Sequence, residues 1–198
     1  MTTNKQAKEI LRSLQKAIVN DDWSMCRETL TRLLPFLDQG VVLQLMLNQI
    51  QRFLIEYLDN ASQDESIQKS LDMLRDIDSF VNLQSQASLV HKLLKDKAGT
   101  PGINNYRNAL KELYQLEKLD TSSNNTNQVI VDIISGTIMG TLDYSWGSRN
   151  PELWSKSFHL ETKSDYFIRA DRFISDPKII RLRASLWNQV ADDIEAFY

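Results

Sequence analysis

The chain has 198 residues, of which 42% are hydrophobic and 25% charged, and its formal net charge is −3 at pH 7. A chain of this length can bury roughly two-thirds or more of its unfolded surface, so it can fold without disulfides or a structural metal. Its single cysteine excludes an intramolecular disulfide and a four-cysteine zinc site, and its weak negative charge argues against general polyanion binding.

Apolar residues at helical spacing predict two helices at the start of the chain. The first helix covers about residues 4–19, and its cationic side chains face outward. Asn20, Asp21 and Asp22 end this helix and cap the next one, which begins near Trp23. Pro35 is expected to kink or end the second helix near Leu34.

The most apolar stretch is 41–58, VVLQLMLNQIQRFLIEYL, in which polar residues recur at steps of three to four positions. This spacing predicts a helix with one narrow polar stripe, which other helices must surround. We therefore expect it to be the central helix of the fold. Because short connections join it to the two preceding helices, residues 4–59 are predicted to form an antiparallel three-helix unit.

The middle of the chain predicts further helices separated by turns. Ser62 and Glu65 form a capping box for a helix whose inward stripe is expected to include Val81. A segment over 84–97 either follows this helix or continues it. The clearest turn is GTPG at 99–102, and a helix over 103–119 is predicted after it.

The polar stretch 120–127, DTSSNNTN, predicts an exposed loop. We expect a single domain, and this loop is the place where it could divide into a helical bundle (1–119) and a C-terminal helical subdomain (128–198). The next stretch, 128–144, is rich in β-branched residues, so a strand over its first residues is an open alternative. We favour a helix because no second strand is visible to pair with it.

On a helix over 128–144, Gly136 and Gly140 lie on one face and allow another helix to approach closely. A loop is expected after Trp146, and Asn150 and Asp176 are predicted to cap two further helices, each followed by a proline. The sequence therefore predicts an all-α fold, an irregular bundle of about seven to nine helices around the central helix 41–58.

No residue pattern in the chain is typical of catalysis, metal binding or cofactor binding. His91 and His159 are the only histidines, and neither has the spacing of a metal-ligand pair. Cys26 lies on an inward-facing stripe, which is typical of a buried, unreactive thiol. We therefore expect no catalytic residue, no metal and no cofactor. An enzyme that uses carboxylates scattered along the sequence is the catalytic alternative.

The segment from Trp146 to Trp187 is the most basic part of the chain. It has eight Lys or Arg residues against five Asp or Glu, a net charge of +3, which leaves −6 for the remainder. Cations beside aromatic rings are typical of surfaces that bind nucleic acid, an anionic ligand or an acidic partner. The candidate binding residues are Arg169, Arg172, Lys178, Arg181, Arg183 and Trp187.

A structural role for these cations is the alternative that we favour. The acidic residues between 64 and 78, or Asp165, Asp171 and Asp192, could pair with them inside the fold. The expected function is then that of a non-catalytic adaptor or regulatory protein that binds another protein or a second copy of itself. Nucleic-acid or other polyanion binding through 146–187 is the alternative function.

The expected location is the cytoplasm. One free cysteine fits a reducing compartment, and the first residues have no apolar segment of the kind found in secretory signals. No run of about 18 uncharged apolar residues is present, so we expect no membrane-spanning helix.

Overall fold

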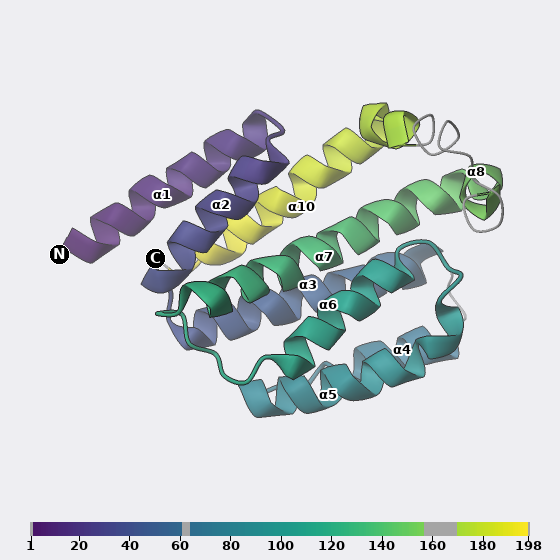
Figure 1. Ribbon diagram of the computed structural model, residues 1–198, viewed down its shortest axis with the longest axis horizontal. Coiled ribbons are helices and arrows are strands. Elements are labelled where there is room, and N and C mark those ends of the chain that lie inside the picture. The colour runs from purple at the N-terminus through teal and green to yellow at the C-terminus, as the bar shows by residue number, and fades with distance from the viewer. Residues whose placement is uncertain (1, 61–63, 157–169, 198) are drawn as a thin grey trace.

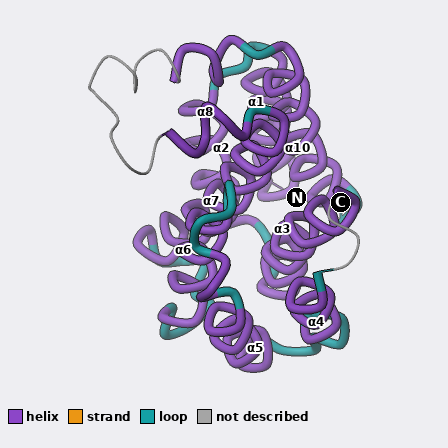
Figure 2. Tube along the Cα trace, turned by 90° about the vertical axis from the view of Figure 1, so that its right-hand side faces the viewer, coloured by secondary structure: helices purple, strands orange, loops and turns teal. Residues whose placement is uncertain are grey.

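The computed structural model describes residues 2–60, 64–156 and 170–197, and every regular element in these ranges is a helix (Figures 1 and 2). Eight of the α-helices described there have nine residues or more, which confirms the all-α prediction. Residues 170–175 are also helical. The elements are α1 (Thr2–Val19), α2 (Trp23–Leu33), η1 (Leu34–Phe36), α3 (Gln39–Asn60), α4 (Glu65–Met73), α5 (Phe80–Leu93), η2 (Lys95–Lys97), α6 (Ile103–Gln115), α7 (Asn124–Arg149), α8 (Pro151–Lys156) and α10 (Pro177–Glu195).

The helices form three layers, with α3, α6 and α7 in the middle (Figure 2). On one side lie α1, α2 and α10, and on the other lie α4 and α5. The predicted central helix is α3, and Ile50, Phe53 and Leu54 on it are fully buried. It shares the central position with α7, which packs on α6, α3, α2 and α10. Among the described residues, no helix combines the length and apolar character needed to cross a membrane.

The helix preferred for 128–144 is confirmed, and α7 extends beyond both predicted ends. It begins inside the polar stretch, because the Ser123 side chain accepts a hydrogen bond from the Thr126 N–H and caps it. The loop predicted after Trp146 is wrong, since α7 continues to Arg149. Trp146 is 3% exposed and its ring lies edge-on to Phe173, so burial of this ring favours the helix over a loop.

The predicted three-helix unit over residues 4–59 is wrong in its third member. α1 and α2 pack together as expected, but α10 joins them in place of α3 (Figure 1). Trp23 on α2 meets Trp187 on α10, with ring centroids 5.5 Å apart. The two helices come from opposite ends of the sequence, so short connections alone could not indicate this contact.

The segment between α3 and α6 differs from the prediction at the cap of α4 and at Val81, and it decides between the two alternatives for α5. Asp64 caps α4 by accepting hydrogen bonds from the N–H groups of Ser66 and Ile67, whereas Ser62 lies outside the described residues. α5 is a separate helix, capped by Ser79, rather than a continuation of α4. Val81 therefore lies off the buried stripe of α5 and is 74% exposed instead of facing inward.

One hydrophobic cluster joins buried residues from α1 through α10. The division near 120–127 stays a prediction, although α7, which follows that stretch, packs directly on α6 and α3, which precede it.

α6 ends at Gln115, four residues before its predicted end. Residues 116–120 then run without a turn or bend to the start of the α7 cap.

The contact between α6 and α7 depends on Gly102 and Gly140, and of these two the sequence predicted a close approach only at Gly140. A Cβ on Gly140 would lie 3.1 Å from the carbonyl oxygen of Gly102 and 3.3 Å from the amide nitrogen of Tyr106. Gly102 caps α6 with φ +77°, in the left-handed region that favours glycine, and its own Cβ position overlaps the Gly140 carbonyl. Only glycines allow the two backbones to approach so closely.

We expect Gly140→Ala to lower the free energy of unfolding by about 1–3 kcal/mol, because the added methyl group presses against main-chain atoms. Gly40→Ala is the matched control, since no atom lies within 4 Å of its Cβ position. That variant should be neutral or more stable by up to about 1 kcal/mol. Urea unfolding followed by circular dichroism measures both, and equal losses would contradict the close α6–α7 contact.

Candidate functional site

Three of the predicted cationic binding residues keep an exposed charge. Arg172 lies in the helical segment 170–175, and Lys178 and Arg181 lie three residues apart in the first turns of α10. None of the three forms an ion pair with another described residue. Arg169, the fourth predicted cation on this surface, lies outside the described residues.

The other two predicted residues, Arg183 and Trp187, are part of the internal packing. The Arg183 guanidinium donates to both carboxylate oxygens of Asp21, with Nε 2.6 Å from Oδ1, and the Arg183 side chain is 14% exposed. Trp187 is 1% exposed, so its ring cannot stack on a surface ligand. The prediction of a binding role for these two side chains is therefore corrected, because packing of α10 on α1 and α2 covers them.

Internal pairing of the basic segment does occur, but with other partners than the sequence indicated. Asp21 follows α1, and Asp176, which pairs with Arg149 at 3.0 Å, is the cap of α10. Asp21 lies between the end of α1 and the start of α2, and Asp176 lies at the start of α10. Each of them pairs with a cation that is distant in the sequence. Among described residues, the acidic residues between 64 and 78 do not pair with the basic segment.

A groove of about 600 Å³ is lined by residues from the first turns of α3 and α5 and from the connection 116–120. Leu43, Phe80, Val81 and Leu119 contribute apolar surface to it. Gln84 on α5 donates a hydrogen bond to the Leu116 carbonyl and so ties the connection to α5. No local sequence pattern indicates this site, because its walls come from three distant segments. Val81, which the sequence placed on an inward-facing stripe, gave no signal of it.

A second hollow, of about 270 Å³, lies between the last turn of α6 and the first turns of α7. It shares Glu117 and Lys118 with the groove, so the two hollows meet at the connection. Lys118 pairs with Asp120 at 3.1 Å. Glu112 and Glu117 are exposed and have no ion-pair partner among the described residues, so this end of the molecule keeps unpaired negative charge.

The groups considered for catalysis have no apparent catalytic arrangement within the described ranges. Burial, followed by the nearby cations Arg107, Lys111 and Lys92, lowers the pKa of His91, and its ring lies edge-on to Tyr114. No set of three or more histidine, cysteine, aspartate or glutamate side chains described here could hold a metal ion. His159 lies outside the described residues.

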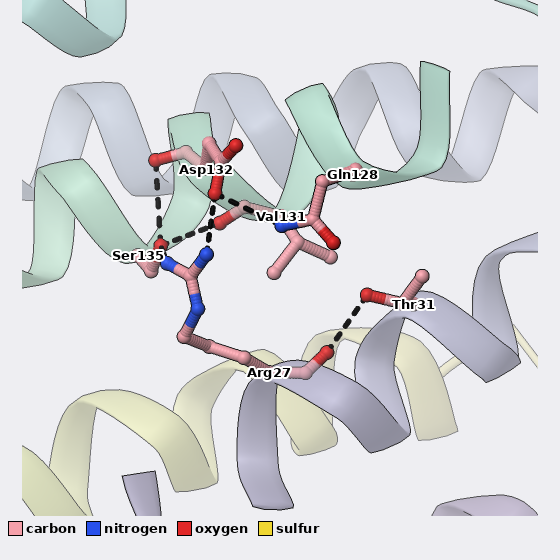
Figure 3. A network of polar contacts seen from close by, with 6 residues as sticks. All are labelled: Arg27, Thr31, Gln128, Val131, Asp132 and Ser135. Carbon is pink, nitrogen blue, oxygen red and sulfur yellow. Dashed lines mark hydrogen bonds and ion pairs between the residues drawn. The ribbon is translucent and has the colours of Figure 1, made fainter. Parts of the chain in front are cut away.

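A network of polar side chains joins α2 to α7 (Figure 3). The Arg27 guanidinium donates to the Asp132 carboxylate and to the Ser135 hydroxyl. Ser135 donates in turn to the Val131 carbonyl at 2.7 Å, and Gln128 donates to Asp132 at 3.1 Å. These contacts join the side chains of α2 to α7 and so orient the two helices on each other.

Comparison with known proteins assigns no family, since no protein family, characterised protein or solved structure matches this chain. The class that the described residues define is an all-α protein with a groove of mixed polar and apolar lining at one end and exposed cations near the start of α10.

Cys26 is 1% exposed, and burial, reinforced by Asp22 and Asp21, raises its pKa to about 12. We expect the native thiol to react with iodoacetamide at pH 8 at least about 100-fold more slowly than the urea-unfolded chain, because the thiolate is the nucleophile. Mass spectrometry of quenched samples gives both rates.

A chain with Cys26→Ser and Ser185→Cys is the control, because Ser185 lies exposed on α10. Its thiol should react at nearly the rate of the unfolded chain. Equally fast labelling of Cys26 in the native wild-type protein would contradict the packing of α2 against α1 and α10.

Proposed function

We propose that this protein is a non-catalytic interaction protein that binds another protein through the groove between α3, α5 and the connection 116–120. One observation carries the proposal: Val81 exposes 74% of its surface beside a groove of about 600 Å³ that already contains Leu43 and Phe80. Apolar side chains grouped around a hollow are typical of the centre of a protein–protein interface. Isolated apolar side chains on a flat surface carry no such meaning.

An adaptor or regulatory role fits this proposal, because a protein that acts by binding a partner through a groove needs no catalytic residues. The cytoplasm remains the proposed location. The polar ends of the groove, including Gln39 and Glu117, resemble the polar rim that surrounds the apolar centre of many interfaces. A second copy of the chain is a further candidate partner, and the molar mass in solution would detect it.

We expect Val81→Asp to reduce partner capture from a lysate of the source cell by about tenfold, because a charge would replace apolar surface in the interface. The assay compares tagged wild-type and variant proteins after nuclease treatment, with quantitative mass spectrometry as the readout. Leu89→Asp is the matched control, since Leu89 is also on α5 and 44% exposed but lies outside the groove.

The control variant should capture partners within about twofold of wild type. If Val81→Asp captures the same proteins in the same amounts as Leu89→Asp, the groove is not the binding site. Circular dichroism of both variants shows that their helical content matches the wild-type protein before the comparison is made.

Polyanion binding is a second candidate function, supported by the exposed and unpaired Arg172, Lys178 and Arg181. Reversal of all three charges should weaken binding to a 20-base-pair DNA duplex. For three phosphate contacts, the slope of log affinity against log salt should be about −2.7 in the wild type and near zero in the variant. Reversal of the exposed α1 cations Lys5, Lys8 and Arg12 is the control, and an equal loss there would indicate general charge attraction rather than a site.

A further inference from the structure

The main chain between α6 and α7 has hydrogen-bonding groups without partners. The Leu116 carbonyl accepts from Gln84, and the Asp120 carbonyl accepts from the Ser123 N–H at 3.1 Å. Between them, the N–H groups of residues 117–120 and the carbonyls of 117–119 have no partner in the described part of the chain. Leu116, at the start of this segment, has extended backbone angles (φ −68°, ψ 113°), and the unpaired main-chain groups that follow it are available to pair with those of an extended peptide.

The two hollows lie beside this segment and meet at Glu117 and Lys118. Successive side chains of an extended peptide point in opposite directions, so a peptide paired here would direct neighbouring residues toward different hollows. The larger hollow is apolar at Phe80, Val81 and Leu119. A helical partner would use its main-chain groups internally and could not pair with the segment.

The charge of the smaller hollow is complementary to a basic side chain. Glu112 and Glu117 line it and have no ion-pair partner among the described residues, whereas Lys118 is balanced by Asp120. The hollow also lies at the C-terminal end of α6, where the last helical carbonyls and the helix dipole favour a cation. The N-terminal end of α7 on the opposite wall is already capped by Ser123.

We propose that the segment bound by this surface is a basic peptide in an extended conformation. Its main chain pairs with residues 117–120, a lysine or arginine side chain lies against Glu112 and Glu117, and an apolar side chain fills the groove beside Val81. This inference rests on the proposed function, because it names the partner segment for the same groove.

The test uses a fluorescein-labelled nine-residue peptide of alternating valine and lysine, blocked at both ends, and fluorescence anisotropy at physiological salt. The wild-type protein should bind it. The double variant Glu112→Lys and Glu117→Lys should bind about tenfold more weakly, because two attractions become repulsions. The control Glu9→Lys reverses an exposed charge on α1 and should change the affinity by less than about twofold.

A series of peptides with one N-methylated main-chain nitrogen each tests the extended conformation. Loss of binding at every second position supports main-chain pairing, because alternate N–H groups face the segment. Tolerance of every N-methyl group, or loss at steps of three to four positions, would overturn the inference. Equal affinity of the peptide for the wild-type protein and for the double variant Glu112→Lys and Glu117→Lys would also overturn the inference.

The outcomes separate this inference from the proposed function. If the basic peptide does not bind while Val81→Asp still removes a cellular partner, the groove is an interface and the inference about a basic extended segment is wrong. If Val81→Asp leaves partner capture unchanged, the proposed function fails, and peptide binding that depends on Glu112 and Glu117 would then describe a site of its own.

Discussion

The close contact of α6 with α7 is the constraint on which the rest of the fold depends. Gly102 and Gly140 bring the two backbones together, and the aromatic rings beside them stack in two pairs that connect three helices. Phe53 lies on Tyr106 with centroids 4.2 Å apart, and Tyr57 lies on Tyr144 at 4.5 Å. The Tyr106 hydroxyl donates to the Ile50 carbonyl at 3.2 Å, so the ring is fixed at both ends. These contacts set α3, α6 and α7 as the middle layer.

The position of the groove follows from that middle layer. Since α6 starts directly against α7 at Gly102 and ends at Gln115, the chain must return along the end of the molecule to begin α7 at Asn124. The return segment passes the first turns of α3 and α5 and lines the groove together with them. Two hollows therefore remain at the place where main-chain groups lack partners.

The basic segment divides in the folded chain into paired and unpaired cations. Arg183 and Arg149 pair with acids at helix ends, and these pairs hold α10 to the end of α1 and to the end of α7. Arg172, Lys178 and Arg181 take no part in those contacts and stay exposed. The net charge of +3 over the segment therefore overstates the charge that it can offer a ligand, because Asp21, which lies outside the segment, neutralises Arg183.

The sequence by itself determined the class of fold, the buried helix 41–58, the helix over 128–144 and the glycine spacing that allows close packing, because helical period and glycine geometry are local properties. It also indicated where caps such as Asp176 begin helices. Only the tertiary structure decided that α10 joins α1 and α2, that Asp21 pairs with Arg183, and that Val81 faces a groove. Those outcomes depend on contacts between residues far apart in the chain, which no local pattern contains.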